Sequence, residues 1–413
     1  MNRIVLLAVL ATWVVWAAEI QAQTFIEAAK VVRLHDEIGS KNPIPIVKCL
    51  DLEQRGKFLA LGGDDHVVRL WNVQTRKFVS QLREHRESVR GLAFSPQDDR
   101  LVTVAQDGQI HFWNVQDGRL LRTLREPVRG TRRVSFQPDG ARFAVCGFDK
   151  NVRVYDSATY KLVATLSAHG TNNEAMAYSN DGSLLAVGGR TGVVRIWRTA
   201  DHKHVTDIEG DGRRVRALAF SPDDSLLAAG GDGPFIMLWN PQDGELIRIF
   251  SERPGKTFAL TFCGDGVLAS GESDNMVRLW NPATGEQTAT LSGHTGTIST
   301  MTFEPATGNL VTGSFDASIR FWTLPETSRS ERSRHDTSIT YSPMSVEPMS
   351  VEPMSVKPIP AMSMPVVSMP VVSMPVVSMP FEPEPVESTP FESIPVLPTP
   401  TAPLASPFPT INF

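Results

Sequence analysis

Between about residues 29 and 323 the chain is built from short runs in which apolar and polar residues alternate. Runs of four to eight residues, such as VRGLAFS from Val89 and QIHFWN from Gln109, end at Pro, Asp or Gly. Alternation of this kind predicts half-buried strands, and the spacing typical of amphipathic helices is absent. The intervening SPQDD, QPDG and SPDD segments supply the residues that tight hairpin turns need. We therefore predict an all-β fold.

These strands recur with a fixed period. An aromatic residue closes each copy, at intervals of 42 residues with one interval of 41: Trp71, Trp113, Tyr155, Trp197, Trp239, Trp280 and Trp322. A second register of apolar residues precedes these aromatics by 19 residues, or by 18 in the sixth copy. Two registers that agree over seven copies indicate one repeat architecture, although the length alone would allow two or three domains.

The copy that ends at Trp322 has the clearest motifs. It contains the pair Gly293-His294, a Phe-x-Pro-x-x-Gly turn, and Asp316 six residues before the Trp. These motifs resemble the WD40 repeat, whose units of about 40–45 residues form four-stranded blades. The resemblance implies a seven-bladed β-propeller, which we assign to residues 23–324.

The resemblance also implies a buried hydrogen-bonded tetrad in each blade, made of a His, a Ser or Thr, an Asp and the closing Trp. Two blades have all four residues by position: His85, Thr103, Asp107 and Trp113 in the second, and His294, Thr312, Asp316 and Trp322 in the seventh. The fourth blade keeps His169 but has Thr191 where the Asp is expected. The fifth has Asp211 at the His position and Gly233 at the Asp position. We give the tetrads a structural role, because half-paired buried polar groups are costly.

The ends of the repeat region predict how the ring closes. Each of the first six aromatics is followed by an outer strand, whereas Trp322 is followed by the polar LPETSRSERSR. The segment 29–34, reading AKVVRL, matches the outer strands in pattern and precedes the first inner strand. We therefore predict a ladder between residues 29–34 and 319–323, which would remove the exposed edges of the last blade.

The flanking segments differ from the repeats. Residues 1–22 carry one Arg, an apolar run and small residues near Ala18 and Ala22, as a cleaved signal peptide does; an uncleaved anchor is the alternative. Residues 325–413 contain PMSVE and SMPVV repeats with Pro every five residues, which predicts an extended, disordered tail. The tail could be a stalk, a spacer or a ligand for a Pro-binding domain, or only a solvated extension.

Composition narrows the function. A net charge of −5 argues against a nucleic-acid-binding protein. The sequence has no phosphate-binding loop, no nucleophile elbow and no metal-ligand spacing, so we expect no cofactor, no metal and no catalytic residue. The three cysteines fall in separate repeats, which predicts buried thiols without disulfides.

One position of the innermost strands is expected to lie at the mouth of the central channel. Across the seven blades it is occupied by Lys48, Arg90, Arg132, Glu174, Arg216, Phe258 and Ser299. Loops expected on the same rim add further cations: Arg86, Arg129, Arg133, Arg213, Arg214, Arg253 and Lys256. The opposite rim is rich in Asp, so we expect one basic and one acidic face. The basic rim could bind an acidic peptide or glycan, since Arg offers bidentate contacts to carboxylates. Alternatively, its Arg residues are solvated or paired with nearby acids.

The sequence thus favours an exported, monomeric, non-catalytic protein-interaction scaffold, with the mature chain free of membrane spans. A short apolar leader and the absence of an Asn-x-Ser/Thr acceptor favour a bacterial periplasmic, surface or secreted setting. A structural cell-envelope protein whose tail is a stalk or anchor is the second hypothesis, and a propeller enzyme is the third. The general link between this fold and binding is an analogy.

Overall fold

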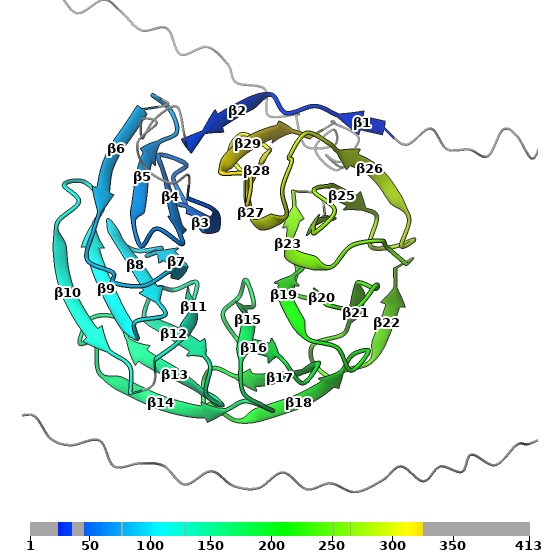
Figure 1. Ribbon diagram of the computed structural model, residues 1–413. Helices are drawn as coiled ribbons and strands as arrows, with labels where there is room; N and C mark the ends of the chain where they lie inside the picture. Colours follow the sequence, from blue (N-terminus) through cyan, green and yellow to red (C-terminus); the bar gives the residue numbers. More distant parts are fainter. Residues whose placement is uncertain are drawn as a thin grey trace, which may run out of the picture. The chain divides into compact units, whose positions relative to one another are not determined.

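The computed structural model describes residues 24–34 and 45–324, except residues 76, 128, 251 and 265. The predicted signal peptide and Pro-rich tail lie outside the described residues. All the elements that the structure bounds in this part of the chain are strands, and they form seven sheets arranged as blades around a central axis (Figure 1). The predicted seven-bladed, all-β architecture is confirmed.

The first four blades each consist of four consecutive strands. Their bounds are, for blade one, β3 (Val47–Leu52), β4 (Phe58–Gly63), β5 (Val68–Asn72) and β6 (Lys77–Leu82); for blade two, β7 (Val89–Phe94), β8 (Arg100–Ala105), β9 (Gln109–Asn114) and β10 (Leu120–Arg125); for blade three, β11 (Thr131–Phe136), β12 (Arg142–Gly147), β13 (Asn151–Asp156) and β14 (Leu162–Ser167); and for blade four, β15 (Asn173–Tyr178), β16 (Leu184–Gly189), β17 (Val193–Arg198) and β18 (His204–Glu209).

The last three blades complete the ring. Blade five consists of β19 (Val215–Phe220), β20 (Leu227–Gly231), β21 (Met237–Trp239) and β22 (Leu246–Ile249). Blade six contains β23 (Thr257–Cys263), β24 (Val267–Glu272), β25 (Val277–Trp280), β26 (Gln287–Leu291) and the N-terminal β1 (Thr24–Ile26). Blade seven contains β27 (Ile298–Glu304), β28 (Asn309–Ser314), β29 (Ser318–Thr323) and the N-terminal β2 (Lys30–Arg33).

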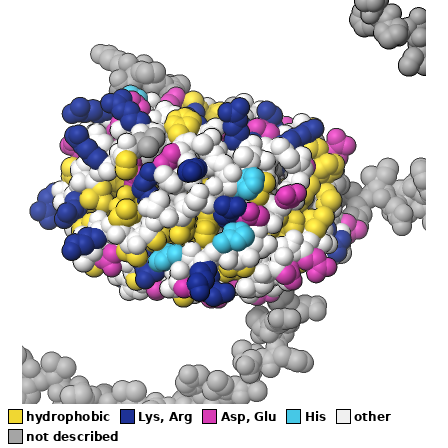
Figure 2. All heavy atoms as spheres, turned by 90° about the horizontal axis from the view of Figure 1, so that it is seen from below, with side chains coloured by type: hydrophobic (Ala, Val, Ile, Leu, Met, Phe, Trp, Pro, Cys, Tyr) yellow, Lys and Arg dark blue, Asp and Glu magenta, His cyan; other side chains and the backbone are white. Residues whose placement is uncertain are grey.

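Burial follows the position of a strand within its blade. Second strands such as β4 and β16 are buried along their whole length, because both of their faces pack against neighbouring blades. In outer strands such as β10 and β14, most residues are exposed or half-buried. Figure 2 views the ring edge-on from the side of β14 and β18, where charged and apolar side chains are interspersed. The hydrophobic core is thus a series of layers between blades.

The N-terminal segment closes the ring as predicted. Strand β2 pairs antiparallel with β29, with Lys30 opposite Phe321 and Arg33 opposite Ser318. The amide of Leu34 donates to the carbonyl of Ala317 at 3.0 Å. Apolar residues of β2, blade seven and blade one, including Leu34, Val47 and Ile319, then form one cluster across the seam.

A second N-terminal contact was not predicted. Strand β1 adds to the outer edge of blade six, parallel to β26, with Thr24 opposite Ala289 and Ile26 opposite Leu291. Short consecutive strands of the same segment therefore bind two neighbouring blades (Figure 1). The three cysteines are buried and free, as expected.

Candidate binding site at the channel mouth

Every innermost strand has a β-bulge at the same place. In each blade, the second residue of that strand is skipped in the ladder, while its neighbours on either side pair with two consecutive residues of the next strand. The skipped residues are Lys48, Arg90, Arg132, Glu174, Arg216, Phe258 and Ser299. A bulge redirects one side chain out of the regular alternation. The fold therefore repeats one device seven times to present these side chains at the channel.

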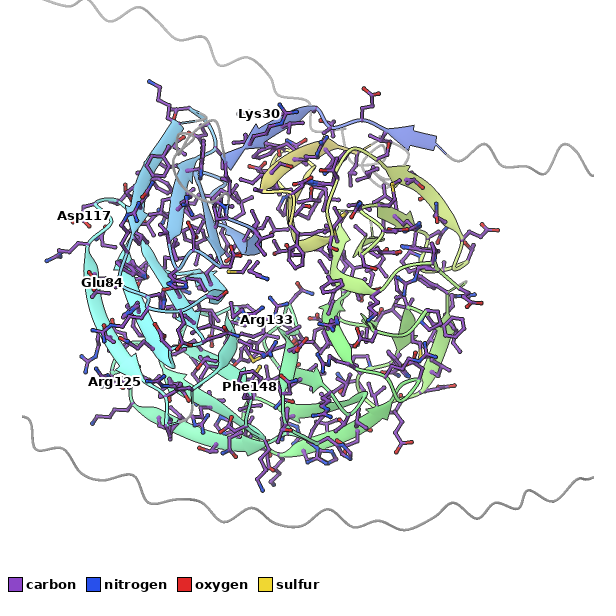
Figure 3. The ribbon with its side chains drawn as sticks, viewed as in Figure 1. Lys30, Glu84, Asp117, Arg125, Arg133 and Phe148 are labelled. Atoms are coloured by element: carbon purple, nitrogen blue, oxygen red, sulfur yellow. The ribbon has the colours of Figure 1, made fainter. Side chains whose placement is uncertain are left out.

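The bulge residues surround one cavity of about 90 Å³ at the mouth of the channel. Arg133 and Phe315 complete its lining. In Figure 3 the labelled Arg133 lies toward the centre of the ring, whereas Asp117 and Arg125 lie at its circumference. The lining contains five cationic side chains and one carboxylate, so the mouth carries excess positive charge.

Glu174 organises one side of this mouth. Its carboxylate accepts hydrogen bonds from Arg132 at 2.8 Å, Arg216 at 2.9 Å and Arg214 at 3.2 Å. Arg133 donates from Nε to the backbone carbonyl of the same residue at 2.7 Å. Four arginines, two from blade three and two from the start of blade five, are thus held by one residue of blade four.

Asp232, in a turn of blade five, neutralises more of the rim. Its carboxylate lies 2.7 Å from Arg216, 3.6 Å from Lys256 and 3.9 Å from Arg214. The expectation of one basic and one acidic face is therefore too simple, because Asp residues of the turns between second and third strands lie among the rim cations.

Aromatic rings form the other part of the mouth. Lys48 Nζ lies 4.5 Å from the ring centre of Phe315, and the guanidinium of Arg132 lies 4.4 Å from that of Phe148. Arg216 stacks in the same way over Phe258 at 4.8 Å. Phe148 and Phe315, both next to a turn Asp, are large apolar side chains left exposed on this rim. The repeated Phe-Asp pair in the sequence was the available signal for them.

The loop cations expected on this rim differ in exposure and in pairing. Arg213 is exposed, and Arg129 is exposed 3.7 Å from Glu87. Arg253 is instead buried, with its side chain 1% exposed, and pairs with Glu272 at 2.9 Å. The expectation that Arg253 adds charge to the rim was wrong, because its position in the repeat is the tetrad His position and lies between blades.

The two tetrads have complete hydrogen-bond geometry. In blade two, His85 joins Asp107 at 3.2 Å and Thr103 at 2.8 Å, and Trp113 Nε1 donates to Thr103 at 2.9 Å. In blade seven, His294 joins Asp316 and Thr312 at 2.8 Å each, and Trp322 Nε1 donates to Thr312 at 2.9 Å. Hydrogen bonding to the His85 side chain and to backbone amides lowers the pKa of Asp107 to about 2. These groups lie in the blades and take no part in the mouth.

Two other blades contain ionic substitutes that sequence reasoning missed. In blade six, Trp280 donates to Ser270, Ser270 donates to Glu272, and Glu272 pairs with Arg253 and with Arg278 at 2.5 Å. In blade three, Tyr155 donates to Glu126 at 2.7 Å, and Arg153 bridges Glu126 and Asp149. In blade five, Asp211 stands at the tetrad His position and Gly233 at the Asp position. A β-carbon at residue 233 would overlap the carboxylate of Asp211, so glycine leaves the space that this carboxylate occupies.

Below the mouth, the channel widens into a cavity of about 230 Å³. Asp51 lies in its lining and accepts hydrogen bonds from the amides of Leu52 and Phe94, both at 2.9 Å. Burial raises the pKa of Asp51 to about 6 despite these two donors. Within the part of the chain that the structure describes, no group of three or more His, Cys, Asp or Glu is placed to hold a metal ion. The described residues also contain no helix long and apolar enough to span a membrane.

Seven blades of four or five strands, two of them with His–Thr–Trp hydrogen-bond chains, define a seven-bladed propeller of the WD40 type. The WD domain, G-beta repeat family matches residues 35–72 and 76–114, and the IFT122 first beta-propeller family matches residues 130–351. The second match covers more than half of the chain. The protein therefore belongs to the WD40-type propeller family defined by the IFT122 first β-propeller. None of the curated proteins compared with it matches its sequence.

Proposed function

We propose that this protein is a non-catalytic scaffold, acting outside the cytoplasm, that holds an acidic segment of a protein partner at its channel mouth. WD40 propellers generally bind protein partners, which supports the broad role. The single observation that carries the specific role is the mouth cavity, where five cationic side chains face one carboxylate. The apolar run and small residues of segment 1–22 support export.

The chemistry of the rim favours a peptide over a compact small molecule. The mouth cavity of about 90 Å³ is below the several hundred Å³ of a typical small-molecule pocket. Exposed Phe148 and Phe315 flank it and offer apolar contact area beside the cations. An extended acidic segment with an apolar side chain can use both features at once. The cations would also speed encounter with such a partner at low salt.

Site-specific photo-crosslinking in the producing cells tests the proposal. A photoreactive phenylalanine analogue replaces Phe315 at the mouth or, as a matched control, Phe78 on the outer strand β6; both side chains belong to residues that are 37% exposed. We expect a discrete crosslinked protein from position 315, recovered outside the cytoplasm, and none from position 78. Equal crosslinking from both positions, or from position 78 alone, would contradict binding at the mouth. Recovery of the crosslinked product only from the cytoplasm would contradict the exported role.

A further inference from the structure

Lys48 and Arg90 differ from every other cation of the mouth. Arg132 and Arg216 are ion-paired to Glu174, and Arg133 is hydrogen-bonded to the backbone. Among the described residues, in contrast, none forms a hydrogen bond or ion pair with the guanidinium of Arg90, whose Nε is buried without a partner. The contact that the structure gives to the Lys48 ammonium is the face of Phe315. This pair of neighbouring cations has no anion of its own.

The surroundings of the pair explain why an anion would stabilise it. Burial lowers the pKa of Lys48, and the nearby positive charge of Arg90 lowers it further. Burial likewise lowers the pKa of Arg90, which feels Arg133 as well. The acids that act on the pair, Asp64 and Glu174, attract it from a distance without contacting it. Two half-buried like charges that share one cavity are disfavoured until an anion lies between them.

We propose that Lys48 and Arg90 form a carboxylate-binding subsite, which takes an Asp or Glu side chain of an extended peptide while an adjacent apolar residue contacts Phe258 and Phe315. The planar fork of Arg90 matches a carboxylate, and Lys48 adds a point charge. Phe258 and Phe315 lie edge-to-face with ring centres 6.3 Å apart, and both line the same cavity. This inference rests on the proposed function and names the cations that bind the ligand; Arg132 and Arg216, already held by Glu174, shape the mouth.

Binding of defined peptides to the full chain tests the subsite. The probe is a fluorescein-labelled, glycine-flanked peptide containing Glu-Phe; its twins replace Glu by Gln or Phe by Ala. Arg90→Gln and Lys48→Gln are compared with Arg213→Gln, which removes an exposed cation of the same rim outside the cavity. We expect Arg90→Gln to weaken binding about tenfold or more, Lys48→Gln several-fold, and Arg213→Gln less than about twofold. The Gln twin should bind the unaltered protein as weakly as Glu-Phe binds Arg90→Gln.

Several outcomes would overturn the subsite. These are no measurable binding of the Glu-Phe probe, an equal loss for Arg90→Gln and Arg213→Gln, or competition by inorganic phosphate at concentrations where acetate has no effect. The thermal melting temperature of Arg90→Gln checks the fold, and Lys48→Gln gives an independent second variant. The test also separates the two proposals. If position 315 still crosslinks the partner equally in the Arg90→Gln and Lys48→Gln backgrounds, the subsite fails while binding at the mouth stands.

Discussion

Blades six and seven bury their closing Trp in different ways. In blade seven, Trp322 donates to Thr312, which joins His294 and then Asp316. In blade six, Trp280 donates to Ser270, and the chain continues through the carboxylate of Glu272 to Arg253 and Arg278. The difference teaches that different residues can supply the polar chain beneath the Trp; the fold also tolerates its absence, since Nε1 of Trp71 in blade one is buried without a partner among the described residues.

The two polar chains differ in how much stability is lost when one partner is removed. The Glu272 side chain is 0% exposed and that of Arg253 1%, so loss of the Glu272 charge leaves Arg253 buried without an opposite charge. The chain in blade seven depends on hydrogen bonds, in which a missing partner leaves smaller polar groups unsatisfied. Blade six should therefore be the more sensitive of the two to a single substitution.

The largest effect is expected for Glu272→Gln. Gln keeps the shape but removes the charge opposite Arg253 and Arg278, so the free energy of unfolding should fall by about 3 to 5 kcal/mol. Denaturant titration followed by Trp fluorescence measures it. Asp201→Asn is the control, because Asp201 makes ion pairs with Arg198 and Lys203 at the surface, and the loss of such solvent-screened pairs should change stability far less. Equal losses would mean that the ionic chain is no more critical than a surface pair.

An intermediate effect is expected for Asp316→Ala in blade seven. Asp316 accepts hydrogen bonds from His294, from the amide of Thr295 and from Ser318, and the substitution leaves these donors unpaired. We expect a loss of about 2 to 3 kcal/mol in the free energy of unfolding. Asp149→Ala in blade three should cost about 1 kcal/mol, because Arg153 keeps its pairing with Glu126. Matching losses in a parallel denaturant titration would show that Asp316 contributes no more to stability than Asp149.

The smallest effect distinguishes the blades by pH. His hydrogen bonds hold the pKa of Asp107 at about 2 and that of Asp316 well below its usual range, whereas burial raises the pKa of Glu272. A carboxyl group whose pKa is lowered by folding stabilises the folded state above the unfolded-state pKa near 4, and this stability is lost as the pH falls toward 2. A carboxyl group whose pKa is raised by folding instead favours the folded state more as the pH falls.

Asp107→Asn should therefore flatten the acid decline of stability between about pH 4 and pH 2, by about 1 to 2 kcal/mol. Melting temperatures measured across this pH range, for the variant and the unaltered protein, give the comparison. The control, Glu272→Gln, should not flatten this decline. The pKa of Glu272 is raised in the folded state, so protonation of Glu272 favours folding as the pH falls. An unchanged slope for Asp107→Asn would show that the tetrad acid is not the titrating group.

The sequence predicted the ring well because local patterns encode it. Period-two alternation, the 42-residue repeat and the unpaired segment 29–34 were enough to place blades and closure, and the tetrads followed from position within the repeat. Counting across copies also selected the seven bulge residues, although nothing in the sequence revealed the bulges that redirect them.

What the sequence could not provide were contacts set by neighbouring blades. Arg253 looked like a loop cation because its partner, Glu272, lies on another strand and matches no motif. Asp232 belongs to no motif that the sequence analysis singled out, yet its carboxylate lies 2.7 Å from Arg216. Parallel addition of β1 to β26 depends on the path of the chain just before β2, which pairs with blade seven. The length and composition of β1 do not specify that path.

The closing strand also dictates an order of events. Strand β2 precedes all the strands of the first blade in the chain, yet its partner β29 is the last described strand, so the seventh sheet cannot be completed until the whole repeat region is present. Such non-local pairing is slow to form, although the entropy of closing so long a loop grows only slowly with its length. Without β2, the outer edge of β29 in blade seven has no pairing strand. Shortening the repeat region from either terminus therefore damages the same blade, although the two cuts lie at opposite ends of the repeat region.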